Sequence, residues 1–290
     1  MHAQDLTVDG LALPAAPALC ERDTPADPAD EVWATIRREG VEAAERDALM
    51  AQPITTALLR HGTFADGLAA RLARKLGDPD LTPATLTALI GEALATEPAI
   101  VQAAATDLAA VRDRDPACPD LITPFLFFKG YLALQAHRVA HFLWLRDRQH
   151  LARHLQSRAS EVFAMDIHPA ARLGCGILID HGTGLVIGET AVVEDDVSIL
   201  QGVTLGGTGK ECGDRHPKIR RGVLLGAGAK VLGNIEVGEG AKVGAGSIVL
   251  DPVAPHTTVV GVPARPVGAT LTDLPALTMD HRLPPPDYAI

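Results

Sequence analysis

A six-residue period of aliphatic side chains runs through the second half of the chain. It occurs in two registers, which break between Val203 and Ile219. Six is a multiple of the two-residue strand period and not of the 3.6-residue helical turn, so the repeat predicts a β-helix of short strands. The repeat positions are Ile167, Leu173, Ile179, Leu185, Ala191, Val197, Val203, Ile219, Leu225, Val231, Val237, Val243 and Val249.

Three six-residue units make one coil, so these thirteen units predict slightly more than four coils. Because neighbouring coils lie about 4.8 Å apart, the predicted prism is roughly 20 Å tall. Val203 and Ile219 are four positions further apart than two units require. We expect these four extra positions to be displaced into a loop over 206–217. A loop that leaves a regular solenoid is a frequent place for a binding site.

Glycine content divides the chain, since residues 161–265 contain 19 of the 27 glycines. Residues 31–160 are instead rich in Ala, Leu, Arg and Glu, with apolar residues at three- and four-residue spacing, which predicts a helical domain. The proline-containing ends, 1–30 and 266–290, show neither pattern and are expected to be flexible tails. The predicted fold is α+β, with an N-terminal helical domain followed by a β-helix over 161–265.

Composition excludes several classes of protein. The 290 residues include 26 Lys and Arg against 36 Asp and Glu, a formal net charge of −10, and such a surface repels nucleic acid. The most apolar stretch, 125–145, contains Lys129 and Arg138, which argues against a membrane span. None of the four cysteines has C-x-x-C spacing, and the N-terminus does not resemble a signal peptide. We therefore expect a soluble, cytoplasmic protein.

Prolines mark several helix ends in the N-terminal half. Thr82-Pro83 and Thr123-Pro124 predict helix starts, in which threonine caps the helix and proline occupies its first turn. Asp115-Pro116 predicts a helix end, because the residue before proline disfavours the α conformation. His137 and His141 have i,i+4 spacing but lack the Glu of a His-Glu-x-x-His motif, so we interpret them as surface or inter-helix histidines.

Two short motifs specifically resemble the serine O-acetyltransferase family. They are Asp-His-Gly-Thr-Gly at 180–184 and Gly-Asp-Arg-His-Pro at 213–217, whereas the hexapeptide repeat alone is common to many acyltransferases. The resemblance covers about residues 32–265. Other matching segments are Asp-Ile-His-Pro-Ala at 166–170, Gly-Glu-Thr-Ala at 188–191, Val-Thr-Leu-Gly-Gly-Thr-Gly-Lys at 203–210, Gly-Val-Pro-Ala-Arg at 261–265, Ala-Val-Arg-Asp-Arg-Asp-Pro at 110–116 and Lys-Gly-Tyr-Leu-Ala-Leu-Gln-Ala at 129–136.

This resemblance implies a fold, an assembly and a reaction. The β-helix would be left-handed, trimers would form through the β-helices, and two trimers could join through the helical domains. The reaction would be transfer of the acetyl group of acetyl-CoA to the hydroxyl of L-serine, which gives O-acetyl-L-serine for cysteine synthesis. Acetyl-CoA would be a co-substrate, with no permanently bound cofactor and no metal.

Serine's hydroxyl needs a general base, and histidine suits this role because its pKa lies near neutrality. A carboxylate on the other ring nitrogen fixes the tautomer. The separation of Asp166 and His181 is three positions less than one coil of three units, so they are expected near a common corner. The resemblance makes His181 the base and Asp166 its partner. The alternative is that Asp180-His181 only fills a turn.

A bound serine zwitterion needs acids for its ammonium and a cation for its carboxylate. The resemblance assigns Asp115 and Asp180 to the ammonium, and Arg215 and His216 to the carboxylate. From the sequence alone, Asp115 could equally be a helix-end acid and Arg215 a loop charge. Glu189 and the acids at 194–196 are expected to be solvated on outer faces.

Acetyl-CoA needs backbone groups along its pantetheine arm and cations near its phosphates. The family positions that line this groove correspond to Gly207, Thr208, Ala227 and Ala245. Lys230 and Lys242 are candidates for phosphate contacts, or else solvated lysines on an outer face.

Three other functions compete with this interpretation. A hexapeptide acyltransferase could use a sugar or antibiotic acceptor, although Asp115 and Arg215-His216 suit an amino acid better. A metal hydratase resembling the γ-type carbonic anhydrases would need three histidines converging between subunits, for which His168, His181 and His216 are candidates. A non-catalytic scaffold would leave Asp166 and His181 without a role.

The resemblance also implies two regulatory partners. L-cysteine differs from serine by sulfur in place of oxygen, so we expect it to be a feedback inhibitor in the same pocket. The chain ends at Ile290 with a free carboxylate, which in the family inserts into the active site of O-acetylserine sulfhydrylase. The sequence therefore predicts a complex between the two enzymes.

Overall fold

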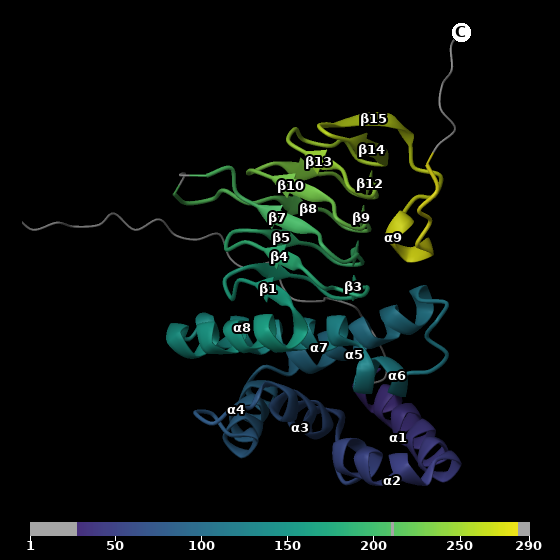
Figure 1. The fold of residues 1–290 in the computed structure, drawn as a ribbon, viewed down its shortest axis with the longest axis vertical. Coiled ribbons are helices and arrows are strands. Elements are labelled where there is room, and N and C mark those ends of the chain that lie inside the picture. Colours follow the sequence, from purple (N-terminus) through teal and green to yellow (C-terminus); the bar gives the residue numbers. More distant parts are fainter. Residues whose placement is uncertain (1–27, 210–211, 284–290) are drawn as a thin grey trace, which may run out of the picture.

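The computed structural model describes residues 28–209 and 212–283. In it a base of helices supports a tall β-prism (Figure 1). The helical elements of the described part are α1 (Pro28–Arg46), α2 (Ala48–Ile54), the π-helix η1 (Thr55–Leu59), α3 (Phe64–Leu76), α4 (Pro83–Thr96), α5 (Pro98–Arg114), α6 (Ile122–Phe127), α7 (Lys129–Trp144), α8 (Gln149–Phe163) and, beside the prism, α9 (Pro275–Thr278).

Local chemistry explains most of the helix ends. Thr82 caps α4 as predicted, since its side chain accepts a hydrogen bond from the amide of Thr85. Helix α5 ends at Arg114 with Asp115 as the C-cap, also as predicted. The predicted cap at Thr123 is wrong, because α6 begins at Ile122 and its first amides are satisfied from a distance. The Glu39 carboxylate accepts hydrogen bonds from the amides of Leu121 and Ile122, both 2.9 Å.

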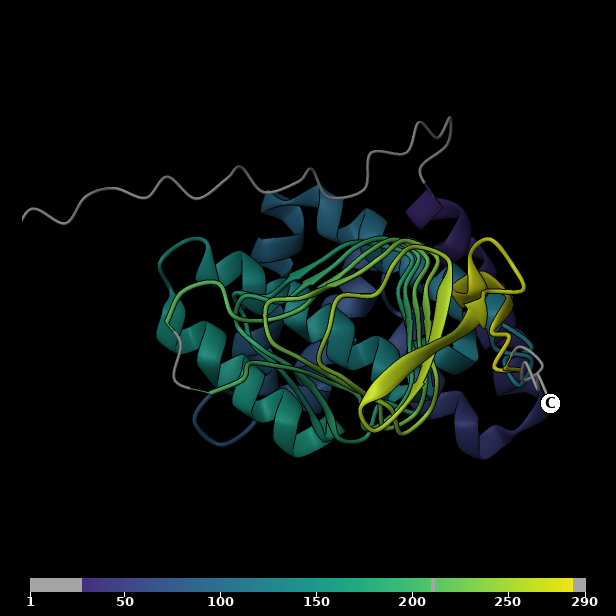
Figure 2. The same cartoon turned by 90° about the horizontal axis from the view of Figure 1, so that it is seen from above.

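The prism consists of three parallel sheets, which Figure 2 shows from above. The first sheet is β1-β4-β7-β10-β13, the second is β11-β8-β5-β2, and the third is β14-β12-β9-β6-β3 with β15 antiparallel at its end. The strands are β1 (Met165–Ile167), β2 (Arg172–Leu173), β3 (Leu178–Ile179), β4 (Leu185–Ile187), β5 (Val192–Val193), β6 (Ser198–Ile199), β7 (Thr204–Gly206), β8 (Lys218–Ile219), β9 (Leu224–Leu225), β10 (Lys230–Leu232), β11 (Glu236–Val237), β12 (Lys242–Val243), β13 (Ile248–Val249), β14 (Thr257–Gly261) and β15 (Ala264–Ala269).

The strand register corrects the predicted period in the lower coils. Ile167 pairs with Ile187, and Ile187 pairs with Leu205. The coil from Ile167 to Ile187 is therefore longer than the coil above it, from Ile187 to Leu205. It has two extra residues, and they fall in the corner between β3 and β4. The positions in register with Ile167 and Leu173 are thus Ile187, Val193, Ile199 and Leu205, not Leu185, Ala191, Val197 and Val203.

The loop is longer than predicted. Because Leu205 pairs with Val231, eight residues leave the regular coil where we expected four. The described ends of this loop project from one corner of the prism (Figure 1). The thirteen predicted units match β1 to β13, and β14 with a bridge between Val237 and Val253 extends the prism to five coils.

A buried ion pair joins the helical base to the prism. The Asp107 carboxylate accepts hydrogen bonds from Arg138 at 2.7 Å, from Gln135 at 3.0 Å and from the amide of Ile177 at 3.0 Å. Arg138 also donates to the carbonyl of Gly174 at 2.6 Å. Asp107 on α5 and Arg138 on α7 therefore hold the turn between β2 and β3 against both helices.

The end of the described chain is ordered where we predicted a flexible tail. Residues 266–283 include most of β15 and all of α9. Helix α9 packs on the third sheet, where the Ser198 hydroxyl donates to the carbonyl of Ala276 at 2.9 Å and Leu274 lies against Gly222. Within the described residues no single helix is long and apolar enough to cross a membrane; α4 and α5 would meet that test only as a pair, bent by 98°.

Candidate active site

The corner that contains the two extra residues presents His181. We call residues 180–184, with those stacked above them at 200–203, 226–229 and 244–247, the His181 corner. The His181 backbone is left-handed, with φ of 55°. Its side chain is 73% exposed, and Nε2 lies 3.8 Å from Oδ1 of Asp180. The histidine side chain is thus displayed at the surface of the chain.

Asp166 lies on β1, one coil below. It pairs with Val186 on β4, and its Oδ1 accepts a hydrogen bond from Gln156 of α8 at 2.7 Å. In this arrangement of side chains the acid beside His181 is Asp180, and Asp166 is bound to Gln156. The pairing of Asp166 with His181 stays a prediction.

The corner after the first sheet contains the second set of predicted residues. We call residues 188–191, 207–209 and 212–217 the His216 corner. The Thr190 hydroxyl oxygen accepts hydrogen bonds from the amides of Arg215 at 3.0 Å and His216 at 3.1 Å. The Thr190 amide in turn donates to Nδ1 of His216 at 3.2 Å. Because Nδ1 accepts, the neutral ring bears its proton on Nε2.

Packing and burial complete this corner. The His216 ring covers Gly188, where any Cβ would come within 2.1 Å of the ring. Burial, with the nearby Arg215 cation, lowers the pKa of His216, which favours the neutral imidazole. Because a Cβ at position 188 would overlap the ring, only glycine there lets the His216 ring lie against the coil.

Glu189 is not the free outer acid that we expected. Its Oε2 lies 2.6 Å from Nη2 of Arg215, and this hydrogen bond lowers the pKa of the Glu189 carboxyl. Asp196 is another correction, because it is buried and pairs with Arg114 at 3.3 Å and Arg221 at 3.2 Å. Glu189 and Thr190 hold Arg215 and His216 in place but were not among the predicted site residues; the matching Gly-Glu-Thr-Ala segment was the available signal.

One chain does not bring the two corners together. Strand β4 of the first sheet separates the His181 corner, which precedes it, from the His216 corner, which follows it. Asp115 belongs on the side of His181, since its neighbours Val111 and Cys118 pack against Leu178 of β3. The predicted serine-binding residues thus lie in two groups on different edges of the prism.

The predicted acetyl-CoA residues also divide between the corners. Ala227 and Ala245 lie above His181, and the backbone there is a hydrogen-bonded column: Gly246 donates to the carbonyl of Ala227 at 2.8 Å, and Gly202 to that of Thr183 at 2.8 Å. The remaining two, Gly207 and Thr208, follow β7 at the His216 corner.

Neither candidate lysine is solvated on an outer face, because both ammonium groups donate to backbone carbonyls. Lys230 is half-buried and donates to the carbonyl of Gly202 in the His181 corner. Lys242 is 2% exposed, and its ammonium donates to the carbonyls of Asp280, at 3.2 Å, and Arg282. Lys242 is therefore covered by the segment after α9, and is not a solvated lysine on an outer face.

Within one chain the three histidines considered for a metal site between subunits lie apart. His168 lies at the coil below the His216 corner, where its Nδ1 accepts from the amide of Ala170 at 3.1 Å and its ring contacts Trp144. His181 lies on the other corner. Across residues 28–209 and 212–283 no group of three or more His, Cys, Asp or Glu side chains is arranged to hold a metal.

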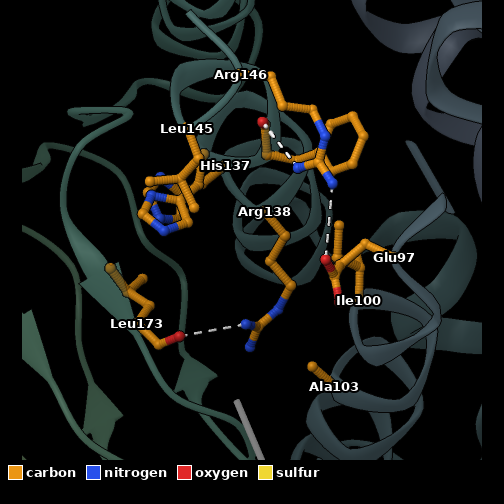
Figure 3. A pocket seen from close by; sticks show the side chains of 10 residues that line it. Glu97, Ile100, Ala103, His137, Arg138, Leu145, Arg146 and Leu173 are labelled. Carbon is orange, nitrogen blue, oxygen red and sulfur yellow. Dashed lines mark hydrogen bonds and ion pairs between the residues drawn. The ribbon is translucent and has the colours of Figure 1, made fainter. Parts of the chain in front are cut away.

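A separate cavity of about 60 Å³ lies between α5, α7 and β2 (Figure 3). His137 and His141 line it, which places both between α7 and the prism. His141 donates from Nδ1 to the carbonyl of Pro169 at 2.7 Å, and His137 is 5% exposed. Their neighbours there include Arg138, whose charge is already paired with Asp107. The cavity is away from both corners and has no part in the candidate site.

A helical base and a hexapeptide β-helix with histidines on its corners define a hexapeptide acyltransferase. The family described as "Serine acetyltransferase, N-terminal" matches residues 32–136, and "Bacterial transferase hexapeptide (six repeats)" matches 216–251. The serine acetyltransferase of Escherichia coli strain K12 is 53% identical over 250 residues, 86% of this chain and 92% of that protein. The chain belongs to the serine acetyltransferase family.

Three related solved structures contain small molecules. Soybean serine acetyltransferase complexed with serine is 52% identical, with a TM-score of 0.82, covering 84% of this chain and 100% of that one. The Brucella abortus enzyme in complex with coenzyme A is 49% identical, with a TM-score of 0.83, covering 85% and 99%. A serine acetyltransferase in complex with cysteine is 50% identical, with a TM-score of 0.86, covering 87% and 98%.

Proposed function

We propose that this chain transfers the acetyl group of acetyl-CoA to the hydroxyl of L-serine, giving O-acetyl-L-serine and CoA. The observation that supports this most directly is the inserted corner, which displays His181 beside Asp180 at the foot of a column containing Ala227 and Ala245. The serine and coenzyme A complexes of its relatives agree with these substrates.

In the proposed reaction His181 is the general base. Its unprotonated nitrogen removes the proton of the serine hydroxyl while the oxygen attacks the thioester carbonyl. The tetrahedral intermediate then breaks its carbon–sulfur bond, and the imidazolium returns the proton to the CoA thiolate. Asp166 is proposed to orient the ring and to stabilise its charged form.

The serine zwitterion is proposed to bind between two chains of a trimer. Asp115 and Asp180 on the His181 corner would contact the ammonium, while Arg215 and His216 of a neighbouring chain would contact the carboxylate. Two half-sites on different edges of one prism support this arrangement, because a three-fold axis can place unlike edges of adjacent prisms together.

Acetyl-CoA is proposed to lie along the column above His181. Backbone groups near Ala227 and Ala245 would contact the pantetheine arm. Gly207 and Thr208, from the His216 corner of a neighbouring chain, would contact it as well. Lys230 already faces this corner. Lys242 could contact a phosphate only after the carbonyls of Asp280 and Arg282 leave its ammonium.

The test of the base is His181→Asn, assayed by thiol release from acetyl-CoA with serine. We expect kcat to fall by roughly 10²- to 10⁴-fold, the usual contribution of a general base, while acetyl-CoA still binds. Asp166→Asn should cost less, because the base itself remains. The matched control is His150→Asn on the exposed start of α8, which should retain full turnover. A His181→Asn variant with near-normal kcat would refute the assignment.

We also propose a complex with O-acetylserine sulfhydrylase through Ile290, which lies outside the described residues. A site that binds an amino-acid carboxylate can accept a C-terminal carboxylate in its place. Removing Ile290, or adding one glycine after it, should abolish binding measured by titration calorimetry and leave acetyl transfer unchanged. Tight binding by the truncated chain would contradict the proposal.

A further inference from the structure

The His181 corner rests on the helical base, at the first turn of α7. Gly130, the second residue of that helix, is buried against the end of β3. A Cβ at this position would lie 2.0 Å from the carbonyl oxygen of Ile179. Only glycine permits this approach, and it brings the start of α7 to within two residues of His181.

Lys129, the residue before it, reaches into the corner. Its ammonium donates a hydrogen bond to the hydroxyl of Thr183, 54 residues later in the chain. The Thr183 amide donates to the carbonyl of His181 at 2.9 Å, and the Thr183 carbonyl accepts from the amide of Gly202 at 2.8 Å. Thr183 therefore connects Lys129 to the backbone of the proposed base and to the coil above.

The opposite side of the corner is held by the end of α8. The amide of Gly184 donates to the carbonyl of Ala164 at 2.7 Å, directly after that helix. The Met165 thioether lies against Gly182, where a Cβ would be 2.6 Å from its sulfur. The inserted corner is thus fixed between the start of one helix and the end of another.

Such anchors matter because little else fixes the His181 conformation. Its left-handed backbone is disfavoured for a residue with a Cβ, by about 1–2 kcal/mol, and persists only where the surroundings impose it. Its side chain is 73% exposed, with Nε2 3.8 Å from Oδ1 of Asp180, so packing constrains it little. The backbone contacts of residues 182–184 must therefore determine where the imidazole points.

We propose that Lys129 is a positioning residue for His181, acting through the Thr183 hydroxyl. The proposal rests on the acetyl transfer proposed above, and it gives the helical domain a direct part in that reaction. Lys129 itself does not touch the reacting atoms. It holds the corner in the conformation in which the imidazole can reach the serine hydroxyl.

The test compares Lys129→Met with the wild type in the serine-dependent release of thiol. We expect kcat to fall about ten- to a hundredfold, the range for a catalytic group displaced by about 1 Å. The KM for acetyl-CoA and the melting temperature should stay unchanged. Lys129→Arg retains a donor of similar reach and should recover most of the lost kcat. Lys75→Met, at an exposed lysine of α3, is the matched control and should be fully active.

The second part of the test removes the Thr183 hydroxyl, which accepts the hydrogen bond from Lys129. Thr183→Val should lower kcat to a similar extent, Thr183→Ser should restore it, and Lys129→Met with Thr183→Val should be no worse than either change alone. Full activity in both single variants would overturn the proposal, as would additive losses in the double variant. A raised KM for serine at unchanged kcat would also overturn it, because Lys129 would then bind substrate. If the wild type lacks serine-dependent transfer, the proposed function fails instead.

Discussion

Arg215 is already held in place by its own chain. One terminal nitrogen lies 2.6 Å from Glu189, the other donates to the carbonyl of Gly213 at 3.0 Å, and the backbone is fixed by Thr190. The Arg215 side chain remains 25% exposed, so it is still accessible to a carboxylate. An ordered cation of this kind loses less entropy on binding than a mobile one.

Replacement of Arg215 by alanine should therefore weaken serine binding. A hydrogen bond to a charged group contributes about 1.5–3 kcal/mol, so we expect the KM for serine to rise roughly ten- to a hundredfold. L-cysteine is proposed to occupy the same pocket, so its competitive inhibition constant should rise by a similar factor. Initial rates at varied serine and cysteine concentrations measure both quantities. Arg38→Ala, at an exposed arginine of α1, should change neither; an unaltered KM in Arg215→Ala would make Arg215 only a loop charge.

At the residue scale, the sequence indicates the candidate reacting and binding side chains better than the residues that hold them in place. His181, Arg215 and His216 were predicted because their side-chain types suit the reaction and their motifs resemble a family. Glu189 and Thr190 were not, because their importance depends on contacts with residues far along the chain, which exist only after the loop has folded back. The same holds for Lys129 and Thr183, which are 54 residues apart.

At the scale of elements, α7 is the helix that joins the helical base to the prism. It lies between the helical base and the prism, and all its residues from Gly130 to Ala140 are buried. Its polar members are either paired, as Arg138 is with Asp107, or held neutral, as His137 is. Burial, then the neighbouring His141 and Arg138, lowers the pKa of His137 well below 6.5.

This burial predicts a loss of stability in mild acid. Unfolded His137 takes up a proton near pH 6.5, whereas the folded chain keeps it neutral, so acidification below about 6.5 favours unfolding. Burial also lowers the pKa values of His141, His168 and His216, which contribute with the same sign. The free energy of unfolding should therefore decrease between pH 7 and pH 5.5, above the range in which carboxylates titrate.

The measurement is chemical denaturation across that pH range. His137→Gln should reduce the pH dependence by up to about 1.4 kcal/mol per pH unit, the contribution of one proton. His150→Gln, at an exposed histidine of α8, should retain the wild-type slope. If His137→Gln and the wild type lose stability in parallel, the buried histidine does not titrate on unfolding and the prediction is wrong.

Periodicity predicted the elements of the prism but not their register. Both members of each pair, such as Leu185 and Ile187, are buried, so a six-residue period can pass through either position. The two extra residues of the His181 corner were therefore absorbed into an apparently continuous repeat. Residues 266–283 were misjudged for the opposite reason, because α9 has no period of its own and is fixed by contacts with Ser198 and Gly222.

At the scale of the whole molecule, the residues of the proposed site are divided between two edges of the prism. Residue chemistry suggested that His181 and Arg215 act on one substrate, and the topology separates them by the first sheet. Both statements hold if the active unit is a trimer in which the His181 corner of one chain faces the His216 corner of the next. Assembly would then be a condition of catalysis and not only of stability.

This arrangement predicts that two defective chains can restore each other. In mixed trimers of His181→Asn and Arg215→Ala chains, some sites combine an intact His181 from one chain with an intact Arg215 from its neighbour. Random assembly of equal amounts makes about a quarter of the sites complete. Selecting coexpressed, doubly tagged trimers removes the homotrimers, and each remaining mixed trimer has one complete site in three. Assayed at low serine concentration, these trimers should therefore recover about a third of wild-type activity. Mixtures of His181→Asn with Asp180→Asn serve as the control, because both changes affect the same corner and no mixed site regains both residues. Absence of recovery in the first mixture would mean that each site is formed within one chain.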